Sequence, residues 1–239
     1  MILSCKNPTH LSSCLDKIGL KKKHKSVLIK INLARPAEPG HPRTDAALLA
    51  DVIRYIHSYG GACTIAECAN GYLHSNLEQA GLADILQKYH VDILDLDQEE
   101  AEQVIINGEE HYLPKCLRNY DVRIGIPAAS KRPGMIFSNN VKLFVGAVPR
   151  RMYQIDNEAV DWRPRIHIDL HTSVANIYSA VQTYSPFTLF INGGLAMDEV
   201  AGEFRFDEIM VGNDGVALDL YVLEHFFPKQ EIPEYLKRL

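Results

Sequence analysis

The chain has 239 residues, of which 46% are hydrophobic and 23% charged, a balance typical of a folded globular protein rather than a disordered one. Its 25 Lys and Arg residues against 30 Asp and Glu give a formal net charge of −5, which argues against broad electrostatic binding to nucleic acid. No apolar run approaches the roughly 18 residues of a membrane-spanning helix, and no secretory signal is visible, so we expect a cytoplasmic protein that does not bind membranes.

The first third of the chain predicts a strand, a helix and a second strand. Val27–Ile31 is an almost continuous apolar run, typical of a strand buried on both faces. A proline-rich loop at 35–43 follows, and apolar residues then recur with helical spacing over 46–56, with Thr44 placed to cap that helix. Ala62–Ala66 is the second strand, and this order predicts a parallel crossover.

The middle of the chain predicts shorter elements. Helical spacing is interrupted by a glycine within 75–89, and a strand is expected at Val91–Leu94. Asn107-Gly108 lies between two short apolar runs, which predicts a small β-hairpin near residues 103–113. Val122–Ile126 is a further buried strand.

The last part predicts helices over 139–148 and 174–181, strands at 187–191 and 209–211, and a final helix ending at Pro228. We find no repeat, low-complexity tract or clear linker. The alternation of strands and helices therefore predicts one α/β domain over residues 1–239. We expect three layers, with helices on both faces of a mostly parallel sheet.

In open α/β sheets, ligands bind outside the carboxyl ends of the strands. Four of the predicted strands end at polar residues that would then face one shared crevice. They are Val27–Ile31 before Asn32, Ala62–Ala66 before Glu67, Val122–Ile126 before Lys131, and Phe187–Ile191 before Asn192.

Lys30 and Asn32 alternate along the first strand, so their side chains point to the same face. A lysine inside a buried strand needs a partner, because burying an unpaired ammonium is costly. Two interpretations stay open: a structural ion pair with Glu67 or an aspartate, or a contact with an anionic ligand.

Cations are dense between Lys131 and Arg151 for an acidic protein, which indicates a ligand bearing phosphate or carboxylate. Lys131 and Lys142 are candidate ligands of that anion, whereas Arg150 and Arg151 equally fit exposed positions. No Walker loop and no Gly-x-Gly-x-x-Gly motif follows a strand, so a standard nucleotide site is not indicated.

Asp219 has apolar neighbours throughout the final helix, so we expect it to be buried or to face the crevice. A buried carboxylate requires a cation or several hydrogen-bond donors, and Lys30 or Lys142 could supply the cation. Asp219 and Glu67 are the candidate catalytic acid–base groups.

His167, Asp169 and His171 would share one face of a strand and could then bind zinc, iron or manganese. Asp169 or Thr172 could equally cap the helix that follows, and we assign no metal site. Five cysteines without a Cys-x-x-Cys pair predict reduced thiols, of which Cys68 is nearest the proposed crevice.

The chain resembles the family catalogued as domain of unknown function 362, over about residues 27 to 227. The resemblance rests on an ordered set of motifs: Ile29-Lys-Ile-Asn-Leu33, Gly60-Gly-Ala-Cys-Thr-Ile-Ala-Glu67, Asp121-Val-Arg-Ile-Gly-Ile-Pro127, Asn140-Val-Lys-Leu-Phe-Val-Gly-Ala-Val-Pro149 and Gly212-Asn-Asp-Gly-Val-Ala-Leu-Asp219. It implies that the recurring pattern of the family includes Lys30, Asn32, Glu67, Pro127, Lys142, Gly146, Asp214 and Asp219.

The sequence differs from the family pattern at Ile31, at 128–132 and at Asn192-Gly-Gly. It also lacks the cysteine motifs of the ferredoxin-like segment that some relatives carry, which argues against a bound iron–sulfur cluster.

Together these features predict a protein that binds a small anionic molecule at the strand ends. The expected ligand-binding residues are Lys30, Asn32, Lys131, Lys142 and Asn192. Two alternatives stay open: a non-enzymatic, redox-associated or accessory binding module, and a divalent-metal-dependent enzyme. The sequence does not name a cofactor, a reaction or an oligomeric state.

Overall fold

The computed structural model describes residues 1–6, 10–20, 26–33, 43–69, 71–155, 160 and 162–239. The proline-rich loop at 35–43 lies outside these ranges except for its last residue, Arg43.

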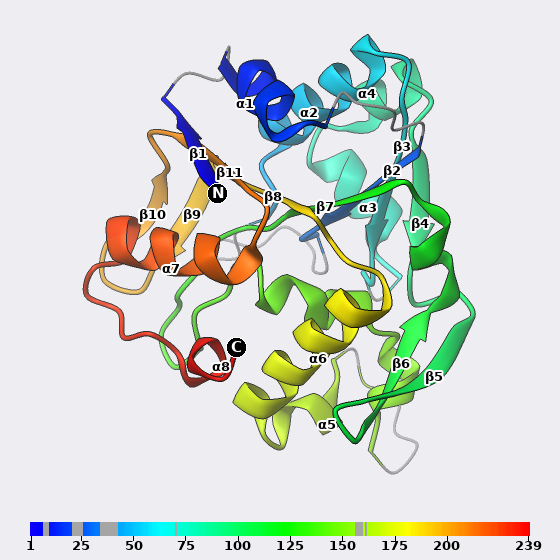
Figure 1. Ribbon diagram of the computed structural model, residues 1–239, viewed down its shortest axis with the longest axis vertical. Coiled ribbons are helices and arrows are strands. Elements are labelled where there is room, and N and C mark those ends of the chain that lie inside the picture. The colour runs from blue at the N-terminus through cyan, green and yellow to red at the C-terminus, as the bar shows by residue number, and fades with distance from the viewer. Residues whose placement is uncertain (7–9, 21–25, 34–42, 70, 156–159, 161) are drawn as a thin grey trace.

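A seven-stranded sheet forms the centre of the fold (Figure 1). In spatial order its strands are β1 (Ile2–Cys5), β11 (Ile209–Gly212), β8 (Leu189–Asn192), β7 (Val122–Ile126), β2 (Ser26–Ile31), β3 (Ala62–Glu67) and β4 (Asp92–Asp95). The five strands from β8 to β4 are parallel to one another. β11 is antiparallel to both of its neighbours, β8 and β1. The predicted α/β sheet, mostly parallel, is confirmed.

One face of the sheet, the upper side in Figure 1, is covered by helices from the first part of the chain. They are α1 (Leu11–Ile18), α2 (Ala46–Ser58), α3 (Leu73–Gln79) and α4 (Ala83–Lys88). α2 buries Leu49, Val52 and Ile56 in the same apolar cluster as the β2 side chains on this face of the sheet. The cap of α2 is Asp45, whose carboxylate accepts from Leu48 N at 3.0 Å, and not Thr44 as the sequence suggested.

The opposite face is covered by later segments. They include the 3₁₀ helices η2 (Lys115–Asn119), η3 (Lys142–Ala147) and η4 (Arg150–Tyr153), and the α-helices α5 (Pro164–His167), α6 (Leu170–Tyr184), α7 (Gly215–Phe226) and α8 (Glu234–Lys237). Phe144 of η3 lies at the centre of this layer, with its ring 4.7 Å from that of Phe187 and 5.5 Å from that of Tyr178. Helices therefore cover both faces, as predicted.

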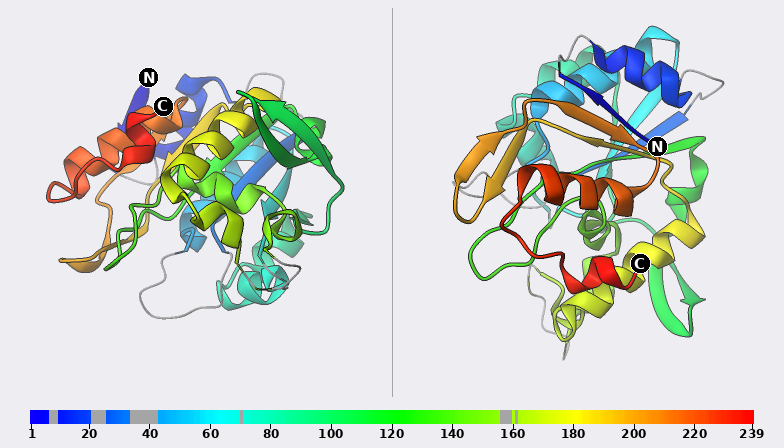
Figure 2. Two further views of the ribbon diagram at one scale, coloured as in Figure 1. Left: turned by 90° about the horizontal axis from the view of Figure 1, so that it is seen from below. Right: turned by 60° about the vertical axis from the view of Figure 1, so that its left-hand side comes forward.

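Two hairpins lie outside the central sheet. The expected one consists of β5 (Ala101–Ile106) and β6 (Glu109–Pro114), joined by Asn107 and Gly108, which both have the positive φ angles that a tight hairpin turn requires. The other, β9 (Leu195–Asp198) with β10 (Gly202–Arg205), was not predicted and projects beyond the sheet (Figure 2).

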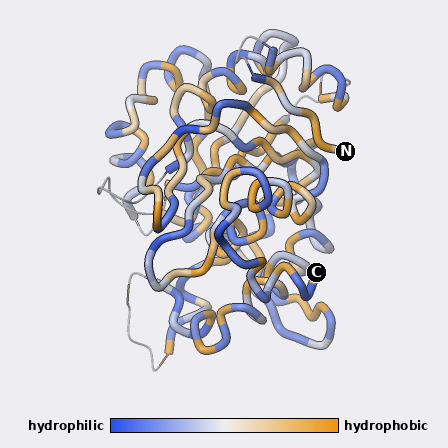
Figure 3. The backbone as a smooth tube through the Cα atoms, turned by 90° about the vertical axis from the view of Figure 1, so that its left-hand side faces the viewer, coloured by the Kyte–Doolittle hydropathy of each residue, from blue (hydrophilic) through white to orange (hydrophobic). Residues whose placement is uncertain are grey.

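Hydrophobic stretches run through the middle of the molecule and hydrophilic ones lie around it (Figure 3). They form two apolar clusters, one on each face of the sheet. Within the described ranges, no helix is both long enough and apolar enough to cross a bilayer.

Candidate functional site

A buried ion pair joins the carboxyl ends of β2 and β3. Lys30 Nζ lies 2.7 Å from Glu67 Oε1, and the two side chains are 0% and 2% exposed. The ammonium also donates to the carbonyl of Ile31 at 2.8 Å. Of the two interpretations of Lys30, the structural ion pair with Glu67 is therefore present. Its ammonium is already bonded to protein groups.

Glu67 accepts two backbone hydrogen bonds in addition to the ion pair. Leu33 N donates to its Oε2 at 3.1 Å, and Cys68 N donates to its Oε1 at 2.9 Å. Cys68 itself is completely buried, and burial raises the pKa of its thiol well above the usual range, which disfavours a reactive thiolate.

The segment 139–147, which contains η3, lies across the carboxyl-terminal part of the sheet. Its first residues lie beside Asn192 of β8, because the Asn140 amide donates to Asn192 Oδ1 at 2.7 Å. Leu143 packs on Gly125 of β7, where a Cβ atom would be 3.1 Å from the leucine methyl group.

At its other end the segment 139–147 covers the ion pair. A Cβ atom on Gly146 would lie 2.5 Å from Glu67 Oε1 and 3.0 Å from Lys30 Nζ, so only glycine fits there without a shift. The segment therefore covers the carboxyl ends of β8, β7, β2 and β3.

A buried carboxylate holds the start of this segment. Asp219 of α7 is 0% exposed and accepts from Asn140 N at 2.8 Å, from the Asn140 amide at 2.9 Å and from Val141 N at 3.1 Å. The Asn192 amide in turn donates to Asn139 Oδ1. Several donors thus surround Asp219, and Lys30, one of the two cations considered for it, pairs with Glu67 instead.

Burial raises the pKa of Asp219 to about 7, against the opposing effect of hydrogen bonds from Val141, Asn140 and Asn139. The Asn139 amide nitrogen is near enough to Asp219 to lower its pKa. It is not within normal hydrogen-bond distance of any acceptor. A carboxyl with this pKa exchanges its proton near neutral pH, as a general acid or base requires.

The Asp219 carboxyl makes stability pH-dependent in a defined direction. Its folded-state pKa of about 7 is above the 3.8 of an ordinary aspartate, so folding favours the protonated form. The stabilisation from protonation is complete below about pH 4 and is lost as the pH rises through 7. Between pH 4.5 and pH 8 we expect wild type to lose roughly 3 kcal/mol relative to Asp219→Asn.

Urea unfolding of wild type and Asp219→Asn at several pH values measures this difference. Asp214→Asn is the matched control, because Asp214 caps the same helix from an exposed position and asparagine caps equally well. Identical pH slopes for wild type and Asp219→Asn would contradict the expected protonation.

Hydrogen bonds through Thr44 connect the ends of β2 and β7, which are neighbouring strands. Thr44, 3% exposed, donates from its hydroxyl to the carbonyl of Ile126 at 2.6 Å and accepts from Asn32 N at 2.8 Å. The preceding residue, Arg43, is half-buried, and its Nη1 is buried without a hydrogen-bond partner in the described part of the chain. From β2 the chain continues to β3 on one side, while β7 lies on the other, so this is the point where strand order reverses.

The other predicted cations take different positions. Lys131 lies on a continuation of β7 beside β9, and its ammonium is 2.9 Å from Glu199 Oε2. Arg151 donates to the backbone carbonyls of Asp97 and Glu99, which attaches the acidic stretch to η4. Lys142 is half-buried on η3.

The residues considered for a metal are in helices and not on a strand. Asp169 accepts from Thr172 N at 3.2 Å and caps α6, which was the alternative interpretation. His167 contacts the carbonyl of Arg163 through Nδ1, and His171 stacks on Tyr235. Among the described residues, no group of three or more His, Cys, Asp or Glu side chains is placed to hold a metal ion.

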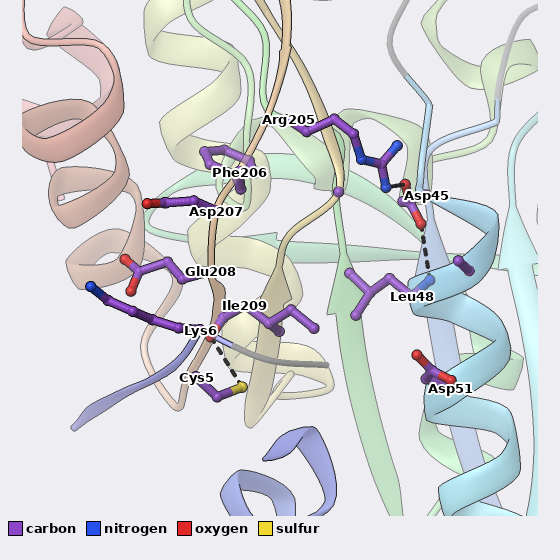
Figure 4. Close-up of a pocket in the computed structure, with 12 residues that line it drawn as sticks. Cys5, Lys6, Asp45, Leu48, Asp51, Arg205, Phe206, Asp207, Glu208 and Ile209 are labelled. Carbon is purple, nitrogen blue, oxygen red and sulfur yellow. Dashed lines mark hydrogen bonds and ion pairs between the residues drawn. The ribbon is translucent and has the colours of Figure 1, made fainter. Parts of the chain in front are cut away.

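A pocket on the α2 side of the sheet has the wrong charge for an anion (Figure 4). Its wall includes four carboxylates and two cationic side chains, of Asp45, Asp51, Asp207, Glu208, Lys6 and Arg205. Arg205 pairs with Asp45 at 2.6 Å, and Glu208 accepts from the hydroxyl of Tyr221 at 3.1 Å. We therefore do not place the anion there.

The strand ends that the sequence singled out do meet at one edge of the sheet, but their side chains form separate groups. Lys30 and Glu67 make one group, and Asn192 with Asp219 makes a second. Asn32 belongs to neither group and donates from its backbone N–H to Thr44, the residue after Arg43, and Arg43 was not among the predicted site residues. The sequence feature that could have indicated Arg43 is its position just before Thr44 and Asp45, where the first crossover helix begins.

Comparisons with known proteins agree with this architecture. A solved structure described as the lactate racemase apoprotein from Thermoanaerobacterium thermosaccharolyticum is similar in fold, with a TM-score of 0.57 at 12% sequence identity. The match covers 94% of this chain and 57% of that one, so the chain spans little more than half the length of that protein. No curated protein shows significant similarity.

The fold thus defines an α/β protein with a mostly parallel sheet. The model of the family described as "Domain of unknown function (DUF362)" matches residues 27–224, and the chain belongs to that family.

Proposed function

We propose that the protein binds a small anion, bearing carboxylate or phosphate, at the carboxyl ends of β2 and β7. The observation that carries this proposal is the buried, unpaired Nη1 of Arg43, the residue directly before Thr44, which joins the ends of β2 and β7 where strand order reverses. Ligands of open α/β sheets bind at such points. A buried guanidinium donor without an acceptor is unfavourable, and an anion would supply that acceptor through a charge-assisted hydrogen bond.

The surroundings of Arg43 fit this role. The next residue, Thr44, accepts from the backbone N–H of Asn32, directly after β2, and donates to the carbonyl of Ile126 at the end of β7. Lys30 is too deeply buried and too closely paired to reach a ligand directly, so in this proposal it supports the wall. The name of the similar structure, lactate racemase, refers to a small carboxylate, which favours that ligand class.

Within this proposal, Asp219 is the better acid–base candidate of the two carboxylates. Its pKa of about 7 suits proton exchange at neutral pH, whereas Glu67 is occupied by Lys30 and two backbone donors. The Asn140 amide, which donates to both Asp219 and Asn192, would orient this carboxyl in an enzymatic reaction.

Thermal unfolding with sulfate, phosphate, lactate and citrate tests the proposal. An anion at 100 times its dissociation constant should stabilise the protein by about 2.7 kcal/mol, which raises Tm by roughly 5–10 °C for a chain of this size. Arg43→Gln should remove a charged hydrogen bond of about 1.5–3 kcal/mol and weaken binding roughly 10- to 150-fold.

Arg54→Gln is the control, because Arg54 is an exposed arginine of α2 that pairs with Asp51 of the same helix. It should keep the full anion response. An equal response in Arg43→Gln and wild type would refute the assigned position, and no response in wild type would refute anion binding.

A further inference from the structure

Asp219 and the proposed anion site lie on the same face of the sheet. Lys30, Gly125 and Phe190 lie in one row across β2, β7 and β8. Asn32 and Asn192 each follow two residues later, so they lie on the same face and two strands apart, about 10 Å. Asn192 contacts Asn140, whose amide also donates to Asp219.

A negative charge held beside Asn32 would therefore lie roughly 10 Å from Asn192, and the Asp219 carboxylate lies on the far side of Asn192, joined to it through the Asn140 amide. The two amides on the Asp219 side of this separation are buried: Asn140 is 0% and Asn192 is 1% exposed. Like charges at this separation in a protein interior repel enough to raise a carboxyl pKa by about one unit. An anion that binds here should therefore favour the protonated form of Asp219.

We propose that the anion binds together with a proton, and that Asp219 takes up that proton. The proposal rests on the proposed function, because it concerns the same ligand. The protein would take up one anion together with a proton, so its affinity for the anion would increase as the pH falls.

Among the described groups around Asp219, none other than Asp219 is suited to take up a proton near neutral pH. Tyr178 of α6 and Tyr235 of α8 face it, and burial raises the pKa of Tyr178 to about 12 and that of Tyr235 well above 10, so both stay neutral. Lys142 is on the segment 139–147, and Asp214 is at the exposed start of α7. β8 contributes the uncharged Asn192.

Isothermal titration calorimetry in buffers of different ionisation enthalpy counts the protons that accompany binding. Sulfate and lactate are suitable probes, because neither titrates between pH 5.5 and pH 9.5. We expect roughly half a proton to be taken up per anion near pH 7.5, and uptake to vanish toward both ends of this range. Affinity should increase roughly tenfold from pH 9 to pH 6.

Asp219→Asn should bind the same probes without proton uptake, while Asp214→Asn should behave as wild type. Binding by wild type with no uptake near pH 7.5, or uptake that persists in Asp219→Asn, would overturn the coupling and leave anion binding intact. Absence of any binding by wild type would overturn both. If Asp219→Asn does not fold, the pH profile of wild type decides alone, since an affinity independent of pH excludes the coupling.

Discussion

Lys30→Met should destabilise the protein by about 3–5 kcal/mol, because it leaves the Glu67 carboxylate buried without its cation. The two side chains are almost completely inaccessible to water, so solvent cannot replace the lost ammonium. Urea unfolding at pH 7 measures the loss. Adding Glu67→Gln to Lys30→Met should recover part of it, since the remaining side chain is then neutral.

Lys131→Met provides the comparison for this result. Its ammonium also pairs with a glutamate, Glu199, but both side chains are partly exposed, at 20% and 28%. Such pairs contribute about 0–1 kcal/mol. A loss below 1 kcal/mol in Lys30→Met, equal to that of Lys131→Met, would show that the buried Lys30–Glu67 pair contributes no more to stability than an exposed pair.

Phe144→Ala should also cost about 3–5 kcal/mol, because it removes a fully buried ring from the layer that covers the sheet. The ring lies within 6.2 Å, centroid to centroid, of the rings of Tyr178, Phe187 and Phe190, and it fixes η3 in place. Thermal or urea unfolding measures the change.

Met135→Ala is the control for Phe144→Ala, since the methionine is 41% exposed and its removal should change stability by less than about 0.5 kcal/mol. Similar effects of the two substitutions would mean that the segment 139–147 is not held by apolar packing.

The sequence was sufficient to predict the central fold, because its apolar runs and glycine stops are strong signals. β2, β3, β7 and β8 all fall within a residue or two of the predicted strands. The strands that were not predicted are short. β1 and β9 have four residues each, too few to show a clear alternation, and β9 is stabilised by its neighbour β10 and by the continuation of β7.

The arrangement of the site could be predicted only in part. A lysine in a buried strand requires a partner, so the Lys30–Glu67 pair was one of two interpretations that the residues allowed. The donors around Asp219 were beyond sequence reasoning, because two of them are backbone N–H groups of a segment 78 and 79 residues away. Arg43 was missed because its loop contains prolines and gives no periodic signal.

The most direct test of the account is to locate a bound anion. Crystals grown with selenate, an isostere of sulfate, would show its position by anomalous diffraction. We expect a selenate within hydrogen-bond distance of the Arg43 guanidinium, near the carboxyl ends of β2 and β7. Selenate bound only elsewhere, for example beside Lys131, or an Arg43 guanidinium that contacts only protein groups in the presence of saturating selenate, would contradict it.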